Sequence, residues 1–386
     1  MKIATLLFTY NRSFHTKQVC EALKRNSVQT EKLIVFQDGP KQDEKAEEWK
    51  KVNALIYGID WCEKEVIVSE RNKGLAEAIV SGIKYAFREY DAVIVLEDDC
   101  VPMHGFVSFM KHGFERYIND KSVYCISGYS WPIPVIDSTG EDAYFCGRIS
   151  SWGWGTWKDR WMQYEQDYGI LSGLKKSRDG SKRLAIWGND LEEMLVNRVR
   201  GTNDSWAVFW ALNVIAQRGL CLNPYQSLIR NIGMDGTGVH CGATDKYNAY
   251  AEEGRERTYT LPRRIETLEI IEKEFSRFYQ NYTVKNEKVD NKETVFVYGM
   301  GTLFFSMERE INEKFYIEGF IDANKKGYYA GRPIIKVEEI SRTQFDKIVV
   351  CMTDRDEGIR CARCLIKEYD ISFDEIVFAQ EISDMG

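Results

Sequence analysis

The sequence predicts an α/β protein in two parts, a larger domain built on a mostly parallel sheet and a smaller α/β domain after it. The first observation is a set of short apolar runs with the composition of buried strands, at 3–8, 33–36, 65–68 and 93–96. The second is the set of helical patterns between these runs, at 14–25, 43–56 and 74–89. Strands that alternate with helices are joined by right-handed crossovers, which makes the sheet mostly parallel.

A second strand–helix–strand pattern, which begins at residue 294, predicts the smaller domain. It opens with TVFVYGMG and continues with apolar runs at 317–322, 346–352 and 374–378. The stretch before it holds a charged helical pattern at 264–279 and then a polar run, which is typical of a linker. We therefore expect domains at 1–250 and 293–386, joined by a helical, charged linker at 251–292.

Composition sets the class of protein. The chain has 386 residues, 44% hydrophobic and 29% charged, and no run approaches the roughly 20 apolar residues that span a bilayer. A net charge of −7 argues against a nucleic-acid binder. The ten cysteines form no regular framework, and the CxxC of Cys361 and Cys364 lacks a second ligand pair. We expect reduced thiols and a cytoplasmic protein.

Polar side chains follow each of the first four predicted strands. They are Thr9, Asn11 and Arg12 after the first, Asp38 after the second, Arg71 to Gly74 after the third, and Glu97, Asp98 and Asp99 after the fourth. Ligands bind at the carboxyl ends of the strands in parallel sheets. The sequence therefore predicts one site at this edge of the sheet.

The acids Glu97–Asp99 directly follow the apolar run VIVL, and no cation stands among them. Adjacent carboxylates repel one another, and burying them unpaired is costly. Mg²⁺ and Mn²⁺ prefer oxygen ligands and complete their coordination with water and substrate phosphates. The triplet therefore predicts a diphosphate held through a divalent metal. The alternative is an acidic surface turn or a helix N-cap.

Four motifs in this region resemble a known family. FTYNR (8–12), VFQDG (35–39), RNKGLAEA (71–78) and VLEDDCVP (95–102) resemble, in order and spacing, the nucleotide-sugar half of GT-A glycosyltransferases. The closest likeness is to the N-acetylglucosaminyltransferase I-like group. Three later motifs are similar to bacterial members that build surface polysaccharide: SWGWGTWKDRW (151–161), DSWAVFW (204–210) and NPYQSLIRNIGMDGTGVHCG (223–242). The resemblance covers about residues 1–245 and implies the Rossmann-like, mixed but mostly parallel GT-A sheet.

The resemblance also implies roles for the residues at the strand ends. Asp38 would accept from the base of a uridine-type nucleotide, and a simple Asp-Gly turn is the alternative. Asp98 would meet the ribose, Glu97 the donor sugar, and Asp99 would coordinate Mn²⁺ or Mg²⁺. Arg12 would lie near the donor phosphates or sugar, as would Arg71 unless it is a surface charge. The predicted nucleotide-sugar site comprises Thr9, Asn11, Arg12, Asp38, Arg71, Glu97 and Asp98.

Asp204 is the predicted catalytic base. Inverting sugar transfer requires a group that takes the proton of the acceptor hydroxyl as its oxygen attacks. A carboxylate beside Trp206 is partly desolvated, which makes it a better proton acceptor, and the resembling family places an Asp near a Trp in this role. The alternative is an N-cap on a helix at 205–217. Asp159 is the rival base, although Lys158 and Arg160 beside it favour a surface ion pair.

Aromatic residues and one histidine complete the predicted site. Trp152, Gly153 and Trp154 are typical of a sugar-contact loop, because indole faces pack on pyranose rings and glycine lets the backbone approach; Trp206 joins them. His240 follows a glycine-rich run that could close over the donor, and GT-A enzymes often place a histidine on the metal or diphosphate here. A structural role is the alternative for His240 and for the tryptophans.

The second domain opens with an incomplete dinucleotide-binding motif. Gly299 and Gly301 follow its first strand, but Phe304 replaces the third glycine, and Asp322 ends the next strand where a ribose-binding acid would lie. The pattern resembles small Rossmann-like domains found beside sugar-modifying enzymes. We expect a degenerate nucleotide-binding or oligomerisation module that carries no chemistry.

Together these features predict a metal-dependent inverting glycosyltransferase. The donor would be a nucleoside-diphosphate sugar, UDP-linked by preference, and the acceptor a saccharide or lipid-linked saccharide in bacterial polysaccharide biosynthesis. The protein would be cytoplasmic; the sequence leaves peripheral attachment to the inner membrane face and homo-oligomerisation open. The alternative is a non-catalytic scaffold whose C-terminal domain binds a nucleotide. Nucleotidyl transfer is disfavoured because no Gly-rich, basic phosphate loop follows the first strand.

Overall fold

The computed structural model falls into two compact units, each considered by itself below. The first consists mainly of the described residues from Met1 to Thr283, and the second mainly of those from Val284 on. The described residues are 1–26, 28, 30–41, 46–133, 140–233, 247, 258–285, 292–325, 327–329, 332–342 and 345–384.

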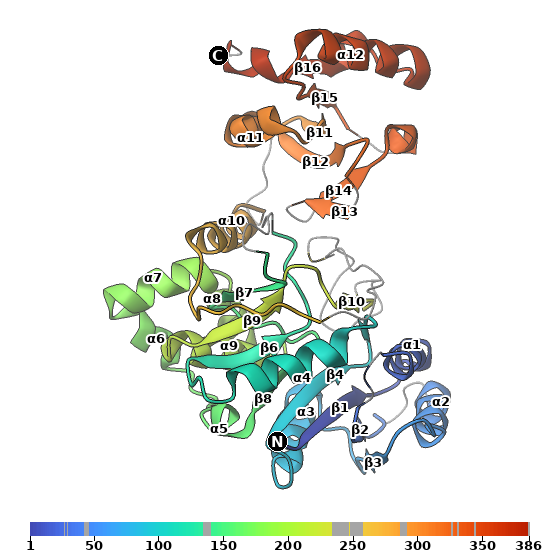
Figure 1. The fold of residues 1–386 in the computed structure, drawn as a ribbon, viewed down its shortest axis with the longest axis vertical. Coiled ribbons are helices and arrows are strands. Elements are labelled where there is room, and N and C mark those ends of the chain that lie inside the picture. Colours follow the sequence, from blue (N-terminus) through green and yellow to red (C-terminus); the bar gives the residue numbers. More distant parts are fainter. Residues whose placement is uncertain are drawn as a thin grey trace. The chain divides into compact units, whose positions relative to one another are not determined.

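An eight-stranded mixed sheet, counted over the described residues, forms the centre of the first unit (Figure 1). The four strands predicted from the sequence pair in parallel, and they are β1 (Ile3–Thr9), β2 (Leu33–Gln37), β3 (Lys64–Val68) and β4 (Ala92–Glu97). Four further strands extend the sheet beyond β4, and they are β6 (Val123–Ser127), β7 (Ala143–Cys146), β8 (Trp154–Trp157) and β9 (Leu220–Pro224). The order is β3-β2-β1-β4-β8-β6-β9-β7, with β8 antiparallel to both neighbours.

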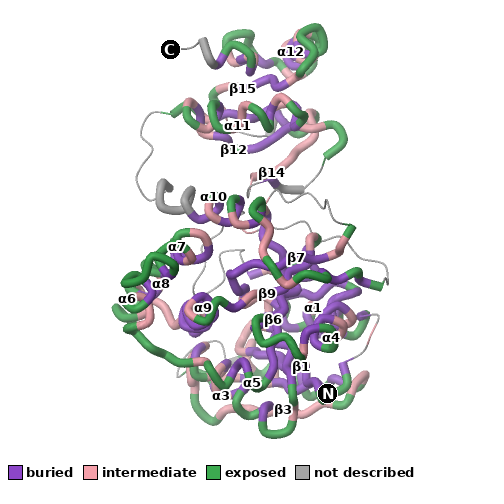
Figure 2. The backbone as a smooth tube through the Cα atoms, turned by 60° about the vertical axis from the view of Figure 1, so that its left-hand side comes forward, coloured by how far each residue is buried: buried purple, intermediate pink, exposed green. Residues whose placement is uncertain are grey.

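Helices connect and cover these strands. Those between the predicted strands are α1 (Ser13–Lys24), α2 (Ala46–Tyr57) and α3 (Leu75–Ala86). The later ones are α4 (Phe106–Tyr117), α5 (Lys158–Trp161), α6 (Ile170–Lys175), α7 (Arg178–Trp187), α8 (Leu191–Val199), α9 (Ala207–Ala216) and α10 (Glu269–Lys285). Figure 2 shows the sheet strands largely buried and much of α6 and α7 exposed. No helix in the described part of the chain is long and apolar enough to cross a membrane.

Two side-chain contacts and one short strand pair hold the strand ends that form the site. Helix α3 packs closely on β1. Glycine at position 82 allows this approach, because a Cβ there would lie 2.6 Å from the Phe8 ring. Phe8 in turn stacks on Phe36 of β2, with ring centroids 4.9 Å apart. A short antiparallel pair, β5 (Cys100–Pro102) with β10 (Ile229–Asn231), anchors the chain directly after the acidic triplet. The carboxyl ends of β1, β2 and β4 are therefore held rigidly together.

Helix α10 lies in the interval predicted as a linker, and it packs as part of the first unit. Its residues Phe275, Phe278 and Tyr279 are buried, and each ring lies between 5.7 and 5.8 Å from Trp131. The exposed charged residues on the outer side of this helix explain why its composition is typical of a linker. Its aromatic side belongs to the hydrophobic core.

The second unit has its own six-stranded sheet over the described residues, in the order β13-β14-β12-β11-β15-β16. Its strands are β11 (Thr294–Tyr298), β12 (Tyr316–Ile321), β13 (Gly327–Tyr329), β14 (Arg332–Ile335), β15 (Lys347–Val350) and β16 (Ile376–Phe378). All neighbours are parallel except β13 with β14. Its helices are α11 (Thr302–Lys314), α12 (Arg355–Tyr369) and the 3-10 turns Val337–Arg342, Phe373–Glu375 and Ala379–Asp384.

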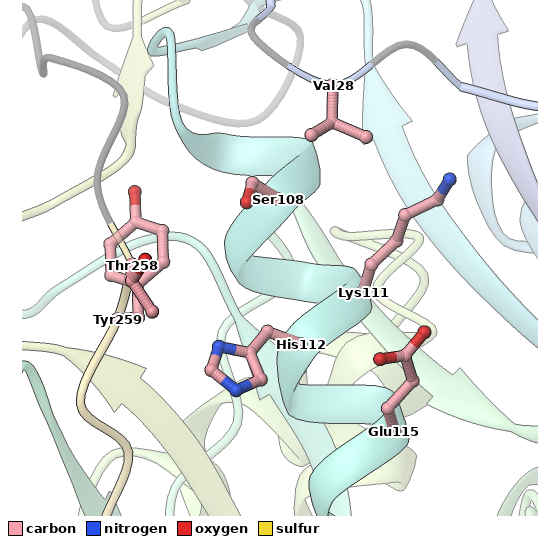
Figure 3. A pocket seen from close by; sticks show the side chains of 7 residues that line it. All are labelled: Val28, Ser108, Lys111, His112, Glu115, Thr258 and Tyr259. Carbon is pink, nitrogen blue, oxygen red and sulfur yellow. The ribbon is translucent and has the colours of Figure 1, made fainter.

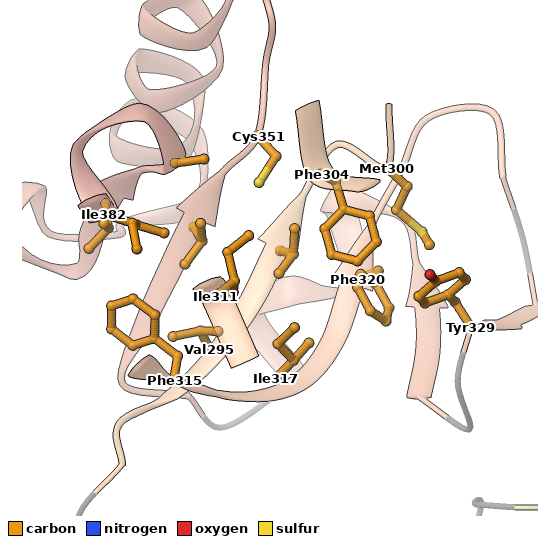
Figure 4. Packing of buried hydrophobic residues seen from close by; sticks show 14 residues of the cluster. Val295, Met300, Phe304, Ile311, Phe315, Ile317, Phe320, Tyr329, Cys351 and Ile382 are labelled. Carbon is orange, nitrogen blue, oxygen red and sulfur yellow. The ribbon is translucent and has the colours of Figure 1, made fainter. Parts of the chain in front are cut away.

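Phe304, where a dinucleotide-binding motif has glycine, is a core residue of this second unit (Figure 4). It is fully buried, and its ring lies 5.3 Å from Phe320 and 5.5 Å from Tyr329 between centroids. The departure from the glycine motif therefore has a packing reason: the ring joins α11 to β12 and β13.

Candidate active site

The acidic triplet lies at the carboxyl end of β4, and the structure supplies the cation that the local sequence lacks. Arg12, which follows the neighbouring strand β1, makes ion pairs with Asp98 and with Asp99, the latter at 2.7 Å. The side chains of Asp98, Asp99 and Arg12 are 7%, 16% and 23% exposed. The sequence offers no cation among these acids, and in the fold a guanidinium 86 residues earlier along the chain compensates them in part.

One guanidinium among three carboxylates leaves an excess of negative charge. Burial raises the pKa of Glu97 to about 8, and the neighbouring charges of Asp99 and Asp98 add to this effect. Burial also raises the pKa of Asp98 to about 6, against the opposing influence of Arg12. The pKa of Arg12 is raised, because the attraction of the two aspartates outweighs the burial that would lower it. His15, on α1, also lowers the pKa of Asp98, and sequence reasoning missed this contribution.

The triplet suits a divalent cation in its chemistry. Its donors are hard carboxylate oxygens, and its uncompensated charge favours another positive ion. The described residues contain no preassembled set of three metal-ligating side chains. His240, the second predicted ligand, lies outside the described residues. Of the two aspartates paired with Arg12, Asp99 is the more exposed. It is therefore the residue better placed to present an oxygen to a metal–diphosphate complex.

Asp38 ties the loop after β2 to the loop between β3 and α3. Its carboxylate accepts from the backbone amides of Gly39 at 2.9 Å, Lys73 at 2.8 Å and Gly74 at 3.0 Å. The Asn72 side chain donates back to the Gly39 carbonyl at 2.9 Å. Only glycine fits at 39, since a Cβ there would lie 2.3 Å from the Arg71 carbonyl carbon. Asp38 therefore does more than close an Asp-Gly turn: it fixes both loops.

The other predicted donor-site residues lie along the same edge in different settings. Thr9 is buried and its hydroxyl donates to the Phe36 carbonyl at 3.1 Å, so it also joins β1 to β2. Asn11 is half-buried beside Arg12. The Arg71 side chain is 71% exposed and pairs with Glu77 of α3 at 2.9 Å, which fits the surface-charge alternative in this conformation.

Asp204 reaches the first turn of α3. Its Oδ2 accepts from the Ala76 amide at 3.0 Å, and its Oδ1 pairs with Arg198 at the end of α8. Its side chain is 33% exposed. Ser205 accepts from Val208 in the first turn of α9, so Asp204 caps α3 and not the helix that follows it. Arg198 was not predicted, and no local signal distinguishes it from the other arginines near it.

Asp159, the rival base, has the surface ion pairs that its neighbours suggested. It accepts from Lys121 at 2.6 Å and from Arg160 at 2.7 Å. Partial burial alone would raise the pKa of Asp159, but these hydrogen bonds outweigh it and lower the pKa. Both oxygens of Asp159 are engaged by side-chain cations, so the surface ion pair given as its alternative is its observed setting.

The tryptophans near the site divide into two groups. Trp154 and Trp206 are fully buried and stack on each other, with centroids 5.2 Å apart. The structure therefore places both in the core, and neither offers a free indole face to a sugar. Trp152 is only half-buried and meets Tyr129 edge-on at 4.8 Å, so it keeps an accessible part. Gly153 serves packing: its φ is +55°, and a Cβ would lie 2.3 Å from Ile229.

A separate hollow of about 620 Å³ lies on the outer face of α4 (Figure 3). Its lining includes Ser108, Lys111 and His112 of α4, with Tyr259 opposite. Lys111 pairs with Glu31 at 2.9 Å, and no strand-end residue contributes to the lining. The candidate active site is therefore the strand-end edge and not this hollow.

A mixed, mostly parallel α/β sheet with an acidic triplet and polar loops at the carboxyl ends of adjacent strands is consistent with the GT-A fold. Residues 6–137, which contain those strand ends, match the family described as Glycosyl transferase family 2. The protein thus contains a glycosyltransferase domain with the GT-A fold. A comparison with curated proteins found no match.

Solved glycosyltransferase structures show distant similarity. S. aureus TarS 1-349 in complex with UDP-GlcNAc is 15% identical over 36% of this chain and 36% of that chain, with a TM-score of 0.27. TarS 1-349 alone aligns at 11% identity over 62% and 63%, with a TM-score of 0.36. The mannosyltransferase PcManGT from Pyrobaculum calidifontis, in complex with GDP-Man and Mn2+, is 8% identical over 56% and 69%, with a TM-score of 0.32. The chain thus spans about a third of the first of these relatives.

Proposed function

We propose that this protein is a metal-dependent inverting glycosyltransferase that uses a nucleoside-diphosphate sugar, with uridine as the preferred base. The observation that carries the proposal is the excess of acidic groups at the end of β4, where a single guanidinium pairs with Asp98 and Asp99 and the third acid, Glu97, adjoins them. A site that must hold a diphosphate through a cation needs such an excess.

The strand-end residues would divide the donor between them. Asp38 accepts from three backbone amides, and an ionised carboxylate has about four lone-pair positions, which leaves one for a base N–H. Asp98 would bind the ribose and Glu97 the donor sugar. Arg12, anchored by both aspartates, would present its remaining N–H donors to the phosphates. Thr9, Asn11 and Arg71 would border the nucleotide.

Asp99 would hold the divalent cation, with Asp98 and Glu97 adding negative charge. When bound, Mn²⁺ or Mg²⁺ would neutralise the leaving diphosphate as a Lewis acid. Asp99 is 16% exposed at the end of a buried strand, so the chain orients it without help from the metal. A contribution from His240 stays a prediction.

Asp204 would take the proton from the acceptor hydroxyl. The Ala76 amide and the Arg198 guanidinium each hold one of its oxygens, which fixes the carboxylate plane. Its partial exposure leaves it reachable by substrate. Preorganisation of this kind lowers the entropic cost of placing the base beside the attacking oxygen. Trp152 would be the aromatic contact for a sugar, because Trp154 and Trp206 are core residues.

The acceptor would be a saccharide or a lipid-linked saccharide of bacterial polysaccharide biosynthesis, reached at the cytoplasmic face of the membrane. The likeness of the motifs at 151–161, 204–210 and 223–242 to surface-polysaccharide enzymes supports this part of the proposal.

For the second unit we propose a Rossmann-like module without chemistry. Its strand order places β11 between β12 and β15, and in such sheets ligands bind where the order reverses. Asp322 instead accepts from the amides of Met300 at 3.1 Å and Lys325 at 2.9 Å. A Cβ at Gly299 would lie 3.0 Å from Met352 Cε. The acid is committed to backbone amides of its own loop and of the loop after β11, which supports a degenerate nucleotide site.

Assay of the purified chain with a panel of sugar nucleotides, in Mn²⁺ and in EDTA, tests the proposal. We expect metal-dependent release of the nucleoside diphosphate from one donor. Asp99→Asn should abolish metal-dependent donor binding, whereas Asp204→Asn should keep donor binding and lose transfer. If no donor binds or turns over in the presence of metal, and a nucleotide binds at Gly299 and Gly301 instead, the scaffold alternative holds.

A further inference from the structure

We propose that the groove beside Asp204 is the acceptor site and that it selects a saccharide carrying a negative charge remote from the attacking hydroxyl. This inference rests on the proposed function and deepens it by naming the acceptor class. The groove has a volume of about 660 Å³ and lies between helix α3 and a second wall that contains Tyr164, Arg198 and Asp204.

Helix α3 forms one wall of the groove, because one of its faces is buried on the sheet and the other is free to line the groove. Ile79, Gly82 and Ile83 are buried on the side that packs on the sheet. The opposite stripe contributes Glu77 and Lys84 to the groove, at the helical spacing of one face. The groove therefore runs along the helix axis away from the base. From Ala76, which holds Asp204, to Lys84 the helix rises about 12 Å.

Charge in the groove is unbalanced. Lys73, Lys84 and Arg198 line it, against the carboxylates of Glu77 and Asp204. Each carboxylate is already paired, Glu77 with Arg71 and Asp204 with Arg198. Lys73 and Lys84 have no ion-pair partner within the described ranges of the chain. Two uncompensated ammonium groups in a chain of net charge −7 mark this groove for an anion.

The second wall offers neutral contacts near the base. Tyr164 stacks on Trp161 with centroids 4.5 Å apart and an angle of 5° between the rings, so its position is fixed. Its hydroxyl accepts from the Gln166 amide at 3.1 Å. The tyrosine supplies an aromatic surface for a sugar ring, and its hydroxyl and the Gln166 amide supply hydrogen-bonding groups for sugar hydroxyls. The lysines of the groove remain available to bind a negatively charged group.

The shared chemistry of the ligand is an anionic group about 12 Å, the rise from Ala76 to Lys84, from the reacting hydroxyl. A lysine ammonium is a compact point charge that binds a carboxylate or a phosphate equally readily. A uronic acid in the glycan and a phosphate attached to it are two sources of this chemistry, and binding measurements distinguish them.

Isothermal titration with three matched trisaccharides tests the inference: one neutral, one ending in glucuronate and one ending in a sugar phosphate. The full chain is saturated with UDP and Mn²⁺ in each titration. We expect the wild type to bind the two anionic probes about tenfold more tightly than the neutral one, since charge-assisted contacts are the stronger ones. Preference for one anion would identify the source, and equal preference would support the inference as stated.

Three variants separate a binding role from a structural one. Lys84→Gln should reduce the preference for anionic probes about five- to tenfold, and Lys84→Arg should retain it. Lys50→Gln, an exposed lysine on α2 paired with Glu47, is the matched control and should change nothing. Equal affinity of the wild type for neutral and charged probes, including no measurable binding of any, would overturn the inference, as would a Lys84→Gln variant with unchanged preference.

Metal-dependent binding of a panel of sugar nucleotides by the wild type is measured in parallel. Absence of binding to every donor would contradict the proposed function, while the titrations would still report on the groove.

Discussion

Replacing Arg12 by methionine tests the electrostatics of the acidic triplet. The change removes the guanidinium that pairs with Asp98 and Asp99 and keeps most of the side-chain bulk. Removing one partner of a buried ion pair costs 3–5 kcal/mol, and since Arg12 is 23% exposed we expect a value near the low end, about 3 kcal/mol at pH 7.5. Arg71→Met is the matched control, because its pair with Glu77 is exposed and should contribute less than about 1 kcal/mol.

The loss should shrink in acid. The pKa values of Glu97 and Asp98, about 8 and about 6, lie above their ordinary values, so both groups are largely neutral at pH 5 and need less compensation. At pH 5 we expect Arg12→Met to lower the free energy of unfolding by less than about 2 kcal/mol. Added Mn²⁺ should restore part of the stability at pH 7.5, because it supplies the lost positive charge.

Urea unfolding followed by tryptophan fluorescence measures this change in the first unit alone, because all ten tryptophans lie between residues 49 and 210. Equal losses at pH 5 and pH 7.5 would refute the reasoning. So would an Arg12→Met variant no less stable than Arg71→Met.

Three further predictions use the same fluorescence assay. Arg148→Met should cost about 3–5 kcal/mol, because Arg148 and Asp190 form a bidentate pair with both side chains 7% exposed; adding Asp190→Leu should recover most of it, and no recovery would mean that the ion pair is not the cause. Gly153→Ala should destabilise by about 1–3 kcal/mol, since a Cβ would overlap an isoleucine side chain at positive φ; Gly173→Ala, on helix α6 with open space around it, should be neutral or stabilising, and equal effects would argue against the packing account. In EDTA the first unit should lose stability as pH rises from the ordinary Glu97 pKa of 4.5 to its folded value of about 8, because the folded state favours the protonated acid; Glu97→Gln should flatten this slope, and stability that rises over the same range would contradict it.

The part of the fold that the sequence predicted is the part with a regular local pattern. Strands β1–β4 and helices α1–α3 alternate, and each strand contains a run of apolar residues. Strands β6–β9 were not predicted, because the sequence around them does not alternate regularly between apolar runs and helical patterns and because strands such as β6 and β9 pair between segments far apart in the chain. Helix α10 was assigned to a linker because its charges are visible in the sequence, whereas its aromatic contacts depend on Trp131.

The site divides in the same way. The acidic triplet and Asp38 are recognisable because each directly follows a strand. The pairing of Arg12 with two acids 86 and 87 residues away depends on the adjacency of β1 and β4. Tryptophan serves a core and a sugar site equally well, so composition could not separate buried Trp154 from half-buried Trp152. The hydrogen bond from the Ala76 amide to Asp204 likewise depends on the tertiary structure.

The central claim is that a divalent cation at the end of β4 joins Asp99 to the diphosphate of the donor. Electron–nuclear double resonance of Mn²⁺ in the presence of the protein and UDP tests it directly, because phosphorus couples measurably only when phosphate oxygen is bound to the ion. We predict a ³¹P coupling in the wild type that differs from that of a protein-free sample of Mn²⁺ and UDP and that reverts to the protein-free value in Asp99→Asn. A wild-type spectrum without ³¹P coupling, or an unchanged spectrum in Asp99→Asn, would contradict the account.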